Sequence, residues 1–271
     1  MSNILKWSLV LVALVIFDSC NNPPSAIGTG ANATGRVILA QAIYTQTPLP
    51  YSGVTVTLEG TNYSTVTDDS GYYSFQAIPA GSYNVLFSKP GYGSVRLFSM
   101  KDSLSETGST HWGTQTMFKI ATIVTTLQSV SIGEDLDIQE EAIFLKGAFI
   151  PDTSIFWRDY SIAMFWSHTP DVSSTPGHYS GFFTLENDLI MGAFFNDALG
   201  TFSGVIPADW WLNSHLNSGD SIYFAVYGAP CYNSYYPYNG LYYDYFDPTI
   251  KQGVLTSINQ TPSPVFGTTI P

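Results

Sequence analysis

The sequence predicts an all-β protein made of two antiparallel β-sandwich domains. Apolar and polar residues alternate along many short segments, and turn residues separate these segments at intervals of about ten positions. Helical spacing of apolar residues is confined to one short stretch. Of the 271 residues, 45% are hydrophobic, 15% are aromatic and only 11% are charged. A chain with this much apolar material can bury a core, so intrinsic disorder is excluded.

The charge balance excludes one class of partner. The chain has 9 Lys and Arg residues against 21 Asp and Glu residues, which gives a net charge of -12. Nucleic-acid binding depends on clustered cations that displace the counterions of the phosphates. The basic residues here are spread along the whole chain, so we expect no nucleic-acid partner.

The first 20 residues predict an export signal. A single cation, Lys6, precedes an apolar run from Trp7 to Phe17, which is too short to span a bilayer but suits the core of a signal peptide. The run ends in Phe17-Asp18-Ser19-Cys20, which resembles a bacterial lipobox of the relaxed Bacteroidetes type, although Phe17 stands where an aliphatic residue is usual. The resemblance implies that signal peptide 1–19 is removed and that Cys20 is acylated, for instance with palmitate. An ordinary signal followed by a chance Cys is the alternative.

The lipid-anchor hypothesis has consequences for the exported protein. If Cys20 carries lipid, Cys231 has no partner and the mature chain has no disulfide. Residues 20–34 are rich in Pro, Gly, Ser and Asn, which predicts a flexible tether. We therefore expect a protein of the cell envelope that is anchored by lipid to the outer membrane, on its periplasmic or its surface side.

The first predicted domain covers residues 35–125. Strict alternation in 53–58 and 82–87 places Val and Leu, or Val and Phe, on a buried face. The turn sequences 68–71 and 79–81 reverse the chain between these segments. Short strands with frequent turns of this kind are typical of a sandwich.

These turns and strands resemble a known family, the carboxypeptidase regulatory-like domain. The motifs that carry the resemblance are Gly53-Val54-x-Val56-x-Leu58-x-Gly60-Thr61, Thr67-Asp68-x-x-Gly71-x-Tyr73-x-Phe75, Ile78-Pro79-Ala80-Gly81-x-Tyr83-x-Val85 and Lys89-Pro90-Gly91-Tyr92. They cover roughly a quarter of the chain and occur in the family's order. The resemblance implies a transthyretin-like (prealbumin-like) sandwich that acts as a structural module and brings no catalytic residues and no cofactor.

The second predicted domain covers residues 128–271. The number and spacing of its strands give an immunoglobulin-like sandwich as an analogy. One short helix is expected over 207–216, with Trp211 and Leu212 closing one end of the sandwich. The expected strands are 142–149, 161–167, 179–186, 190–195, 200–206, 221–227, 253–259 and 265–270.

Catalytic and metal-binding patterns are lacking from the sequence. The four histidines, His111, His168, His178 and His215, fall in different segments without the paired spacing of zinc ligands. Convergence of His168 and His178 with Asp171 across a hairpin is the less favoured alternative. The chain also lacks a G-x-S-x-G nucleophile motif. We therefore predict no enzyme activity, no metal and no cofactor.

An acidic run from Glu134 to Glu141 holds five carboxylates in eight positions. Clustered oxygen ligands suit Ca²⁺ chemically, but the run lacks the glycine and the spacing of an EF-hand loop. Solvated charge on a linker or an edge strand is the favoured interpretation, and a calcium site is the alternative.

Tyrosine is concentrated near the C-terminal end. Nine of the 18 tyrosines lie between Tyr223 and Phe246, and Pro237, Asn239 and Gly240 make the segment 231–245 a loop. Exposed Tyr offers a rigid face with a polar tip, as in antibody and sugar-binding sites. The hypothesis is a binding surface for a glycan or an envelope protein, and the alternative is a packed lid over the sandwich. The candidate ligand-binding residues are Trp210, Tyr232, Tyr235, Tyr236, Tyr238, Tyr242 and Tyr243.

The sequence as a whole predicts a non-catalytic binding or scaffold module at the cell envelope. Two alternatives stay open at this point. One is a purely structural or accessory lipoprotein. The other is an accessory subunit of a glycan- or peptide-processing system with a weak enzymatic site in the second domain.

Overall fold

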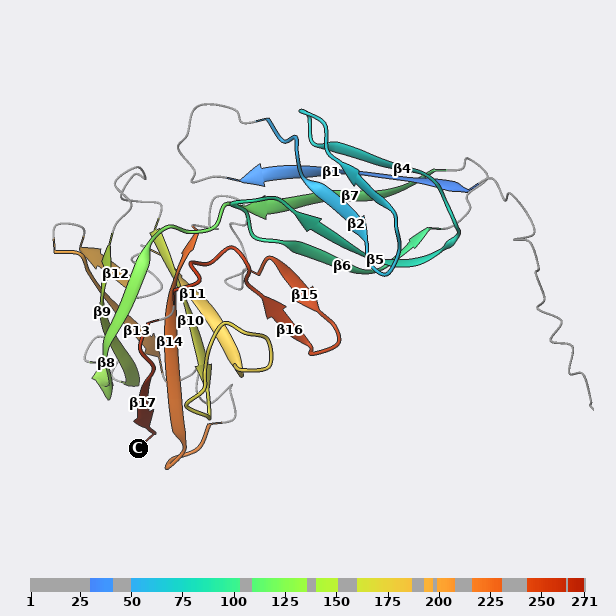
Figure 1. The fold of residues 1–271 in the computed structure, drawn as a ribbon. Helices are drawn as coiled ribbons and strands as arrows, with labels where there is room; N and C mark the ends of the chain where they lie inside the picture. The colour runs from blue at the N-terminus through green and yellow to red at the C-terminus, as the bar shows by residue number, and fades with distance from the viewer. Residues whose placement is uncertain are drawn as a thin grey trace, which may run out of the picture.

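The computed structural model describes residues 30–40, 50–102, 109–135, 140–150, 160–186, 193–196, 199–207, 216–230, 243–261 and 263–270. These ranges contain strands β1 to β17 and no helix, which confirms the all-β prediction. Within them, no helix has the length and apolar character of a membrane span. The strands form two sandwiches that share a boundary, and both are visible in Figure 1.

The first sandwich consists of a three-stranded and a four-stranded sheet (Figure 1). Residues that the alternation predicts to be buried, such as Val56 and Phe87, are fully buried between the sheets together with Trp112. One sheet has the order β4-β1-β7, with β4 (Tyr72–Ile78), β1 (Ala31–Ala40) and β7 (Ser109–Phe118). The other has the order β3-β2-β5-β6, with β3 (Ser64–Val66), β2 (Thr55–Leu58), β5 (Gly81–Ser88) and β6 (Val95–Asp102).

One strand pair of this sandwich departs from the antiparallel expectation. β1 and β7 pair in parallel, with Asn32 opposite Ser109 and Ala40 opposite Phe118. A parallel pair needs a long crossover, so no hairpin signal near either strand could announce it. The remaining pairings between the described strands of both sandwiches are antiparallel.

The expected turn at 68–71 forms as the sequence chemistry requires. The Asp68 side chain accepts hydrogen bonds from the backbone N–H groups of Ser70 and Tyr72, at 2.9 and 2.8 Å. Gly71 has φ +83°, a conformation that L side chains rarely adopt. The turn fixes the register of β4 against β1, because Gly71 O accepts a bond from Val37 N.

The second sandwich consists of two four-stranded sheets around a separate core (Figure 1). One has the order β12-β13-β9-β8, with β12 (Ala193–Asn196), β13 (Thr201–Pro207), β9 (Glu140–Ile150) and β8 (Val124–Asp135). The other has the order β11-β10-β14-β17, with β11 (Gly181–Glu186), β10 (Tyr160–Ser167), β14 (Ser221–Pro230) and β17 (Phe266–Thr269). Their inner faces bury Leu145, Met164 and Phe224, among others.

Several expected elements of this half differ in detail. Residues 124–135, where no strand was expected, form the long strand β8 at the edge of its sheet. Glu134 and Asp135 therefore lie on an edge strand, as the favoured interpretation of the acidic run allows. The expected strand 253–259 ends early, because the short strand β16 (Gln252–Val254) gives way to an irregular segment. Pro207 ends β13, and the rest of the expected helix 207–216 lies outside the described residues except Leu216, which is buried in the core.

A third hydrophobic core joins the two sandwiches. Ala40 and Phe118, at the ends of β1 and β7, pack in one cluster with residues of the second sandwich. The second sandwich contributes Ala163, Phe165, Val172, Tyr179, Ala225, Tyr227, Ala229, Leu255 and Ile258. Residues 161–167 of β10 are therefore all buried, because one face meets the inner core and the other meets the third core.

Two glycines allow the backbones to approach closely at this boundary. A Cβ on Gly93 of the first sandwich would lie 2.6 Å from Ser257 N. A Cβ on Gly228 of β14 would lie 2.2 Å from Ile123 O, in the segment that leads into β8. Both contacts are with backbone, which cannot move aside as a flexible side chain can.

Replacing Gly228 with Ala should therefore destabilise the protein by about 2 kcal/mol or more, because the new methyl group forces two backbone segments apart. Denaturant unfolding of the purified variant measures this. Gly133→Ala is the matched control, since its Cβ would meet Phe144 at an ordinary 3.5 Å, and it should change stability by less than about 0.5 kcal/mol. Equal effects of the two substitutions would contradict the close-approach argument.

Candidate functional site

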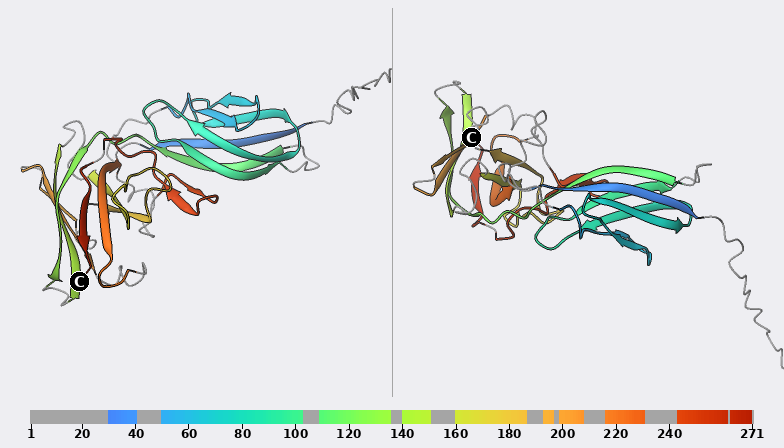
Figure 2. Two further views of the ribbon diagram at one scale, coloured as in Figure 1. Left: turned by 60° about the horizontal axis from the view of Figure 1, so that its bottom comes forward. Right: turned by 90° about the horizontal axis from the view of Figure 1, so that it is seen from above.

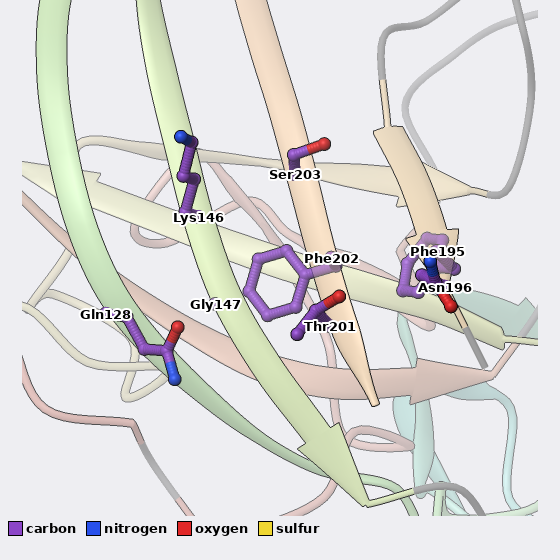
Figure 3. Close-up of a pocket in the computed structure, with 8 residues that line it drawn as sticks. All are labelled: Gln128, Lys146, Gly147, Phe195, Asn196, Thr201, Phe202 and Ser203. Carbon is purple, nitrogen blue, oxygen red and sulfur yellow. The ribbon is translucent and has the colours of Figure 1, made fainter. Parts of the chain in front are cut away.

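The described residues form an open pocket on the sheet β12-β13-β9-β8 of the second sandwich (Figure 3). Its volume is about 620 Å³, within the range of roughly 300–1,000 Å³ that is typical of small-molecule sites. The lining residues are Gln128, Lys146, Gly147, Phe195, Asn196, Thr201, Phe202 and Ser203. They come from all four strands of the sheet.

Strand register brings the polar lining residues together. Lys146 of β9 pairs with Ser203 of β13, and Thr201 of β13 pairs with Asn196 of β12. Side chains of directly paired residues point to the same face of a sheet. On the other side of β9, the register of β8 shifts between Leu127 and Ser129. Gln128 is the extra residue at this irregularity, and its side chain is exposed.

Two aromatic lining residues, Phe195 and Phe202, lie on the inner face of the sheet, opposite the polar lining residues. The Phe202 ring lies over Gly147, where a Cβ would come within 2.2 Å of the ring. Phe195 lies beside Phe202 with 6.2 Å between ring centroids, and it meets Phe149 edge to face at 5.5 Å. Phe202 is buried in the core, whereas Phe195 is only partly buried. Both rings therefore take part in the packing of the second sandwich and border the pocket from its inner side.

The chemistry of the lining favours binding over catalysis. Two amides, two hydroxyls and the ammonium group of Lys146 supply donors and acceptors on the outer face of the sheet. None of the eight lining residues is Asp, Glu, His or Cys. Glycoside hydrolysis normally needs a carboxylate pair, and nucleophilic catalysis needs a nucleophile with a base beside it. The pocket offers neither arrangement.

The Tyr-rich candidate surface falls largely outside the described residues. This holds for Trp210, Tyr232, Tyr235, Tyr236, Tyr238 and Tyr242, and also for the predicted lipid site Cys20. Tyr243 is described and is 45% exposed, and its ring lies 6.1 Å from that of Phe246, which is 46% exposed. The end of the Tyr-rich segment thus presents an aromatic pair to solvent.

The two alternative metal sites of the sequence have different outcomes in the structure. Asp171 Oδ2 lies 3.3 Å from His178 Nδ1 on the exposed surface, and a hydrogen bond from Thr169 is the main cause that lowers the pKa of Asp171. His168 contacts the Trp166 ring instead. No group of three or more metal-ligating side chains occurs among the described residues. The centre of the acidic run, 136–139, lies outside them, as does His215.

The pocket residues were not predicted from the sequence. Lys146 and Ser203 occupy outward positions of two strands that the alternation does predict, 142–149 and 200–206. Their proximity depends on the pairing of β9 with β13, two strands that are about fifty residues apart in the sequence. A single cation in the otherwise apolar strand 142–149 was the only available signal, and it is a weak one.

Comparison with protein families gives one match. Residues 34–107 match the family model of the carboxypeptidase regulatory-like domain. The match includes the motifs of residues 53–92 and confirms the resemblance for the first sandwich, a transthyretin-like fold. None of the curated proteins matches the chain.

Several solved structures resemble this chain at low sequence identity. A type II cohesin–X–dockerin complex from Acetivibrio cellulolyticus matches at 25% identity over 33% of this chain, with a TM-score of 0.30. The chain spans only 58% of that protein. A candidate carbohydrate-binding protein and a DUF3823 family protein, both from Bacteroides uniformis, each match at 12% identity. They cover 90% and 89% of this chain and the whole of their own, with TM-scores of 0.27 and 0.29.

Proposed function

We propose that the protein is a lipid-anchored lipoprotein of the outer membrane that acts as a non-catalytic carbohydrate-binding module. The observation that carries this proposal is the composition of the pocket on β12-β13-β9-β8. Amides, hydroxyls and one ammonium group come together there on the outer face of the sheet through strand pairing. The pocket is therefore suited to a ligand with many hydroxyl groups, as a sugar has.

The absence of a carboxylate from the pocket lining supports retention of the ligand without cleavage. Lys146 is the only ionisable group among the eight lining residues. A lone lysine can donate to hydroxyl and ring oxygens, but it has no partner there for general acid–base catalysis. The ligand class that follows is an uncleaved saccharide.

The position of the first described residues supports the proposed anchor. β1 begins at Ala31, at the end of the first sandwich that is distant from the second sandwich (Figures 1 and 2). The expected tether 20–34 was too long at its C-terminal end, because residues 31–34 belong to β1. A tether of residues 20–30 would hold the first sandwich next to the membrane. The second sandwich, with its pocket, would then project away from the lipid, and the first would act as a spacer.

Substitution of the two long pocket side chains tests the binding site. In Lys146→Ala/Gln128→Ala, affinity for a glycan that the wild-type protein binds on a glycan array should fall at least tenfold, because two donor groups are lost. Isothermal titration calorimetry measures the change. Both side chains are exposed, so the fold should be unaffected.

The matched control is Lys101→Ala/Gln76→Ala, which removes the same two residue types from exposed positions of the first sandwich. It should bind as the wild-type protein does. Equal loss in both double variants would point to a general charge effect. Absence of any glycan ligand would refute carbohydrate binding and favour a purely structural lipoprotein or a partner protein in the envelope.

The Tyr-rich segment is a second proposed contact surface, supported by the exposure of Tyr243 and Phe246. Replacing both Tyr235 and Tyr236 with Ala should weaken glycan binding severalfold if these rings stack on the ligand. The same calorimetric titration measures this. Binding equal to wild type would remove the segment from the site and leave the pocket proposal intact.

The lipid anchor has a separate test. Cys20→Ala removes the proposed acylation site, so the protein should move from the membrane fraction to the soluble fraction of the cells that express it. Fractionation followed by immunoblotting detects the shift. A Cys231→Ala variant should stay with the membrane, and retention of Cys20→Ala there would contradict the anchor.

A further inference from the structure

A short segment, residues 255–259, lies between the two sandwiches and is called the seam here. It follows β16, the second strand of a small hairpin whose first strand is β15 (Tyr245–Asp247). Its hydroxyl and backbone groups bond to both sides. Thr256 Oγ1 donates to Ser94 O at 2.6 Å in the first sandwich, and Asn259 N donates to Gly228 O at 2.7 Å in the second.

The seam also contacts the connection between the sandwiches. Ser257 O accepts a hydrogen bond from Ala121 N at 2.8 Å, directly before the chain enters β8. Leu255 and Ile258 fill the third core. The hairpin adds to this arrangement, because Tyr245 packs against the core of the first sandwich while Gly253 O accepts a bond from Tyr179 Oη at 2.6 Å. The seam is therefore bonded to the first sandwich, to the second sandwich and to the connection between them.

One carboxylate, that of Asp244, organises the seam. Oδ2 accepts the backbone N–H groups of Thr256 and Ser257 at 2.5 and 2.8 Å. The Ser257 hydroxyl lies 3.0 Å from both carboxylate oxygens. Asp244 is buried, and none of its described contacts is with a cation. A buried carboxylate without a counter-charge is costly, and the described donors to Asp244 are all neutral.

Within the part of the chain that the structure describes, the titratable groups on the surrounding elements do not supply that counter-charge. Tyr245 and Asp247 belong to the hairpin, and Tyr179 bonds to it. On the first sandwich, Arg96 pairs with Glu59 at 2.9 Å, and Lys119 is exposed. Burial raises the pKa of Asp244 to about 6, against the opposing effect of the hydrogen bonds from Ser257 and Thr256.

We propose that Asp244 is a proton-operated latch, which sets how readily the seam opens and releases the two sandwiches from their fixed arrangement. The protonated carboxyl keeps both backbone donors on Oδ2. A proton on Oδ1 needs only a reversal of the hydrogen bond with the Ser257 hydroxyl, which can also accept. The seam is therefore closed with Asp244 either ionised or protonated. The closed seam is more stable with Asp244 protonated, because no charge is then buried.

The direction of the pH dependence follows from the raised pKa. In the open state the carboxyl is exposed and has its ordinary pKa near 3.8, whereas in the closed state the pKa is about 6. The closed state therefore binds more protons between these values. The stability that proton binding adds to the closed state is fully present below pH 3.8 and is lost as the pH rises through 6. From pH 7 to pH 5 the ratio of closed to open seam should rise about tenfold.

Hydrogen exchange of the purified protein measures this ratio at the amides of Thr256 and Ser257, after correction for intrinsic exchange rates. In the wild-type protein, their protection should be about tenfold higher at pH 5 than at pH 7. Asp244→Asn keeps an acceptor oxygen but carries no charge. Its protection should be independent of pH and, at pH 7, about a hundredfold above wild type. Asp244→Ala should lose protection at both pH values.

Asp247→Asn is the matched control, because it removes an acid of the same hairpin whose pKa is lowered mainly by the Thr249 hydroxyl. It should keep the wild-type pH dependence. Amides of the central strand β14 report whether each variant is folded. Wild-type protection that does not change with pH, or an Asp244→Asn variant that retains the tenfold change, would overturn the latch.

Discussion

The third hydrophobic core is the constraint on which the rest of the structure depends. It receives Ala40 and Phe118 from the first sandwich, and Phe165, Tyr179 and Tyr227 from the second. Because it covers the outer faces of β10 and β14, these strands are buried on both sides, which is unusual for antiparallel strands. Burial of a large aromatic side chain contributes about 2 kcal/mol or more. The two sandwiches therefore stabilise each other, and polar groups at their boundary must find partners within the protein.

The third core explains why the Asp244 carboxylate is buried, and it decides which sheet can carry the pocket. The sheet β11-β10-β14-β17 is occupied by the third core, so the opposite sheet, β12-β13-β9-β8, is the one that keeps an outer face open to solvent (Figure 1). The pocket lies on that sheet. A fixed boundary between the sandwiches then fixes the direction in which the pocket faces relative to Ala31, where the proposed tether would join.

Much of the fold was predictable from local patterns, and the site was not. Alternation places Val54, Val56 and Phe87 in the first core, and the Asp68–Gly71 turn has a sequence signature of its own. The parallel pairing of β1 with β7 and the meeting of Lys146 with Ser203 are non-local, and no residue near either strand encodes them. The continuous apolar character of 161–167 was an available sign of burial on both faces. Asp244 gave no sign, because its cost depends on partners that tertiary structure supplies.

The most direct test of the account is calorimetric unfolding of the purified protein at pH 5. Two sandwiches that share a core and a closed seam should melt together, in one transition whose calorimetric and van't Hoff enthalpies agree. Two separate transitions, or a calorimetric enthalpy well above the van't Hoff value, would show that the sandwiches unfold independently and would contradict the third core as the central constraint.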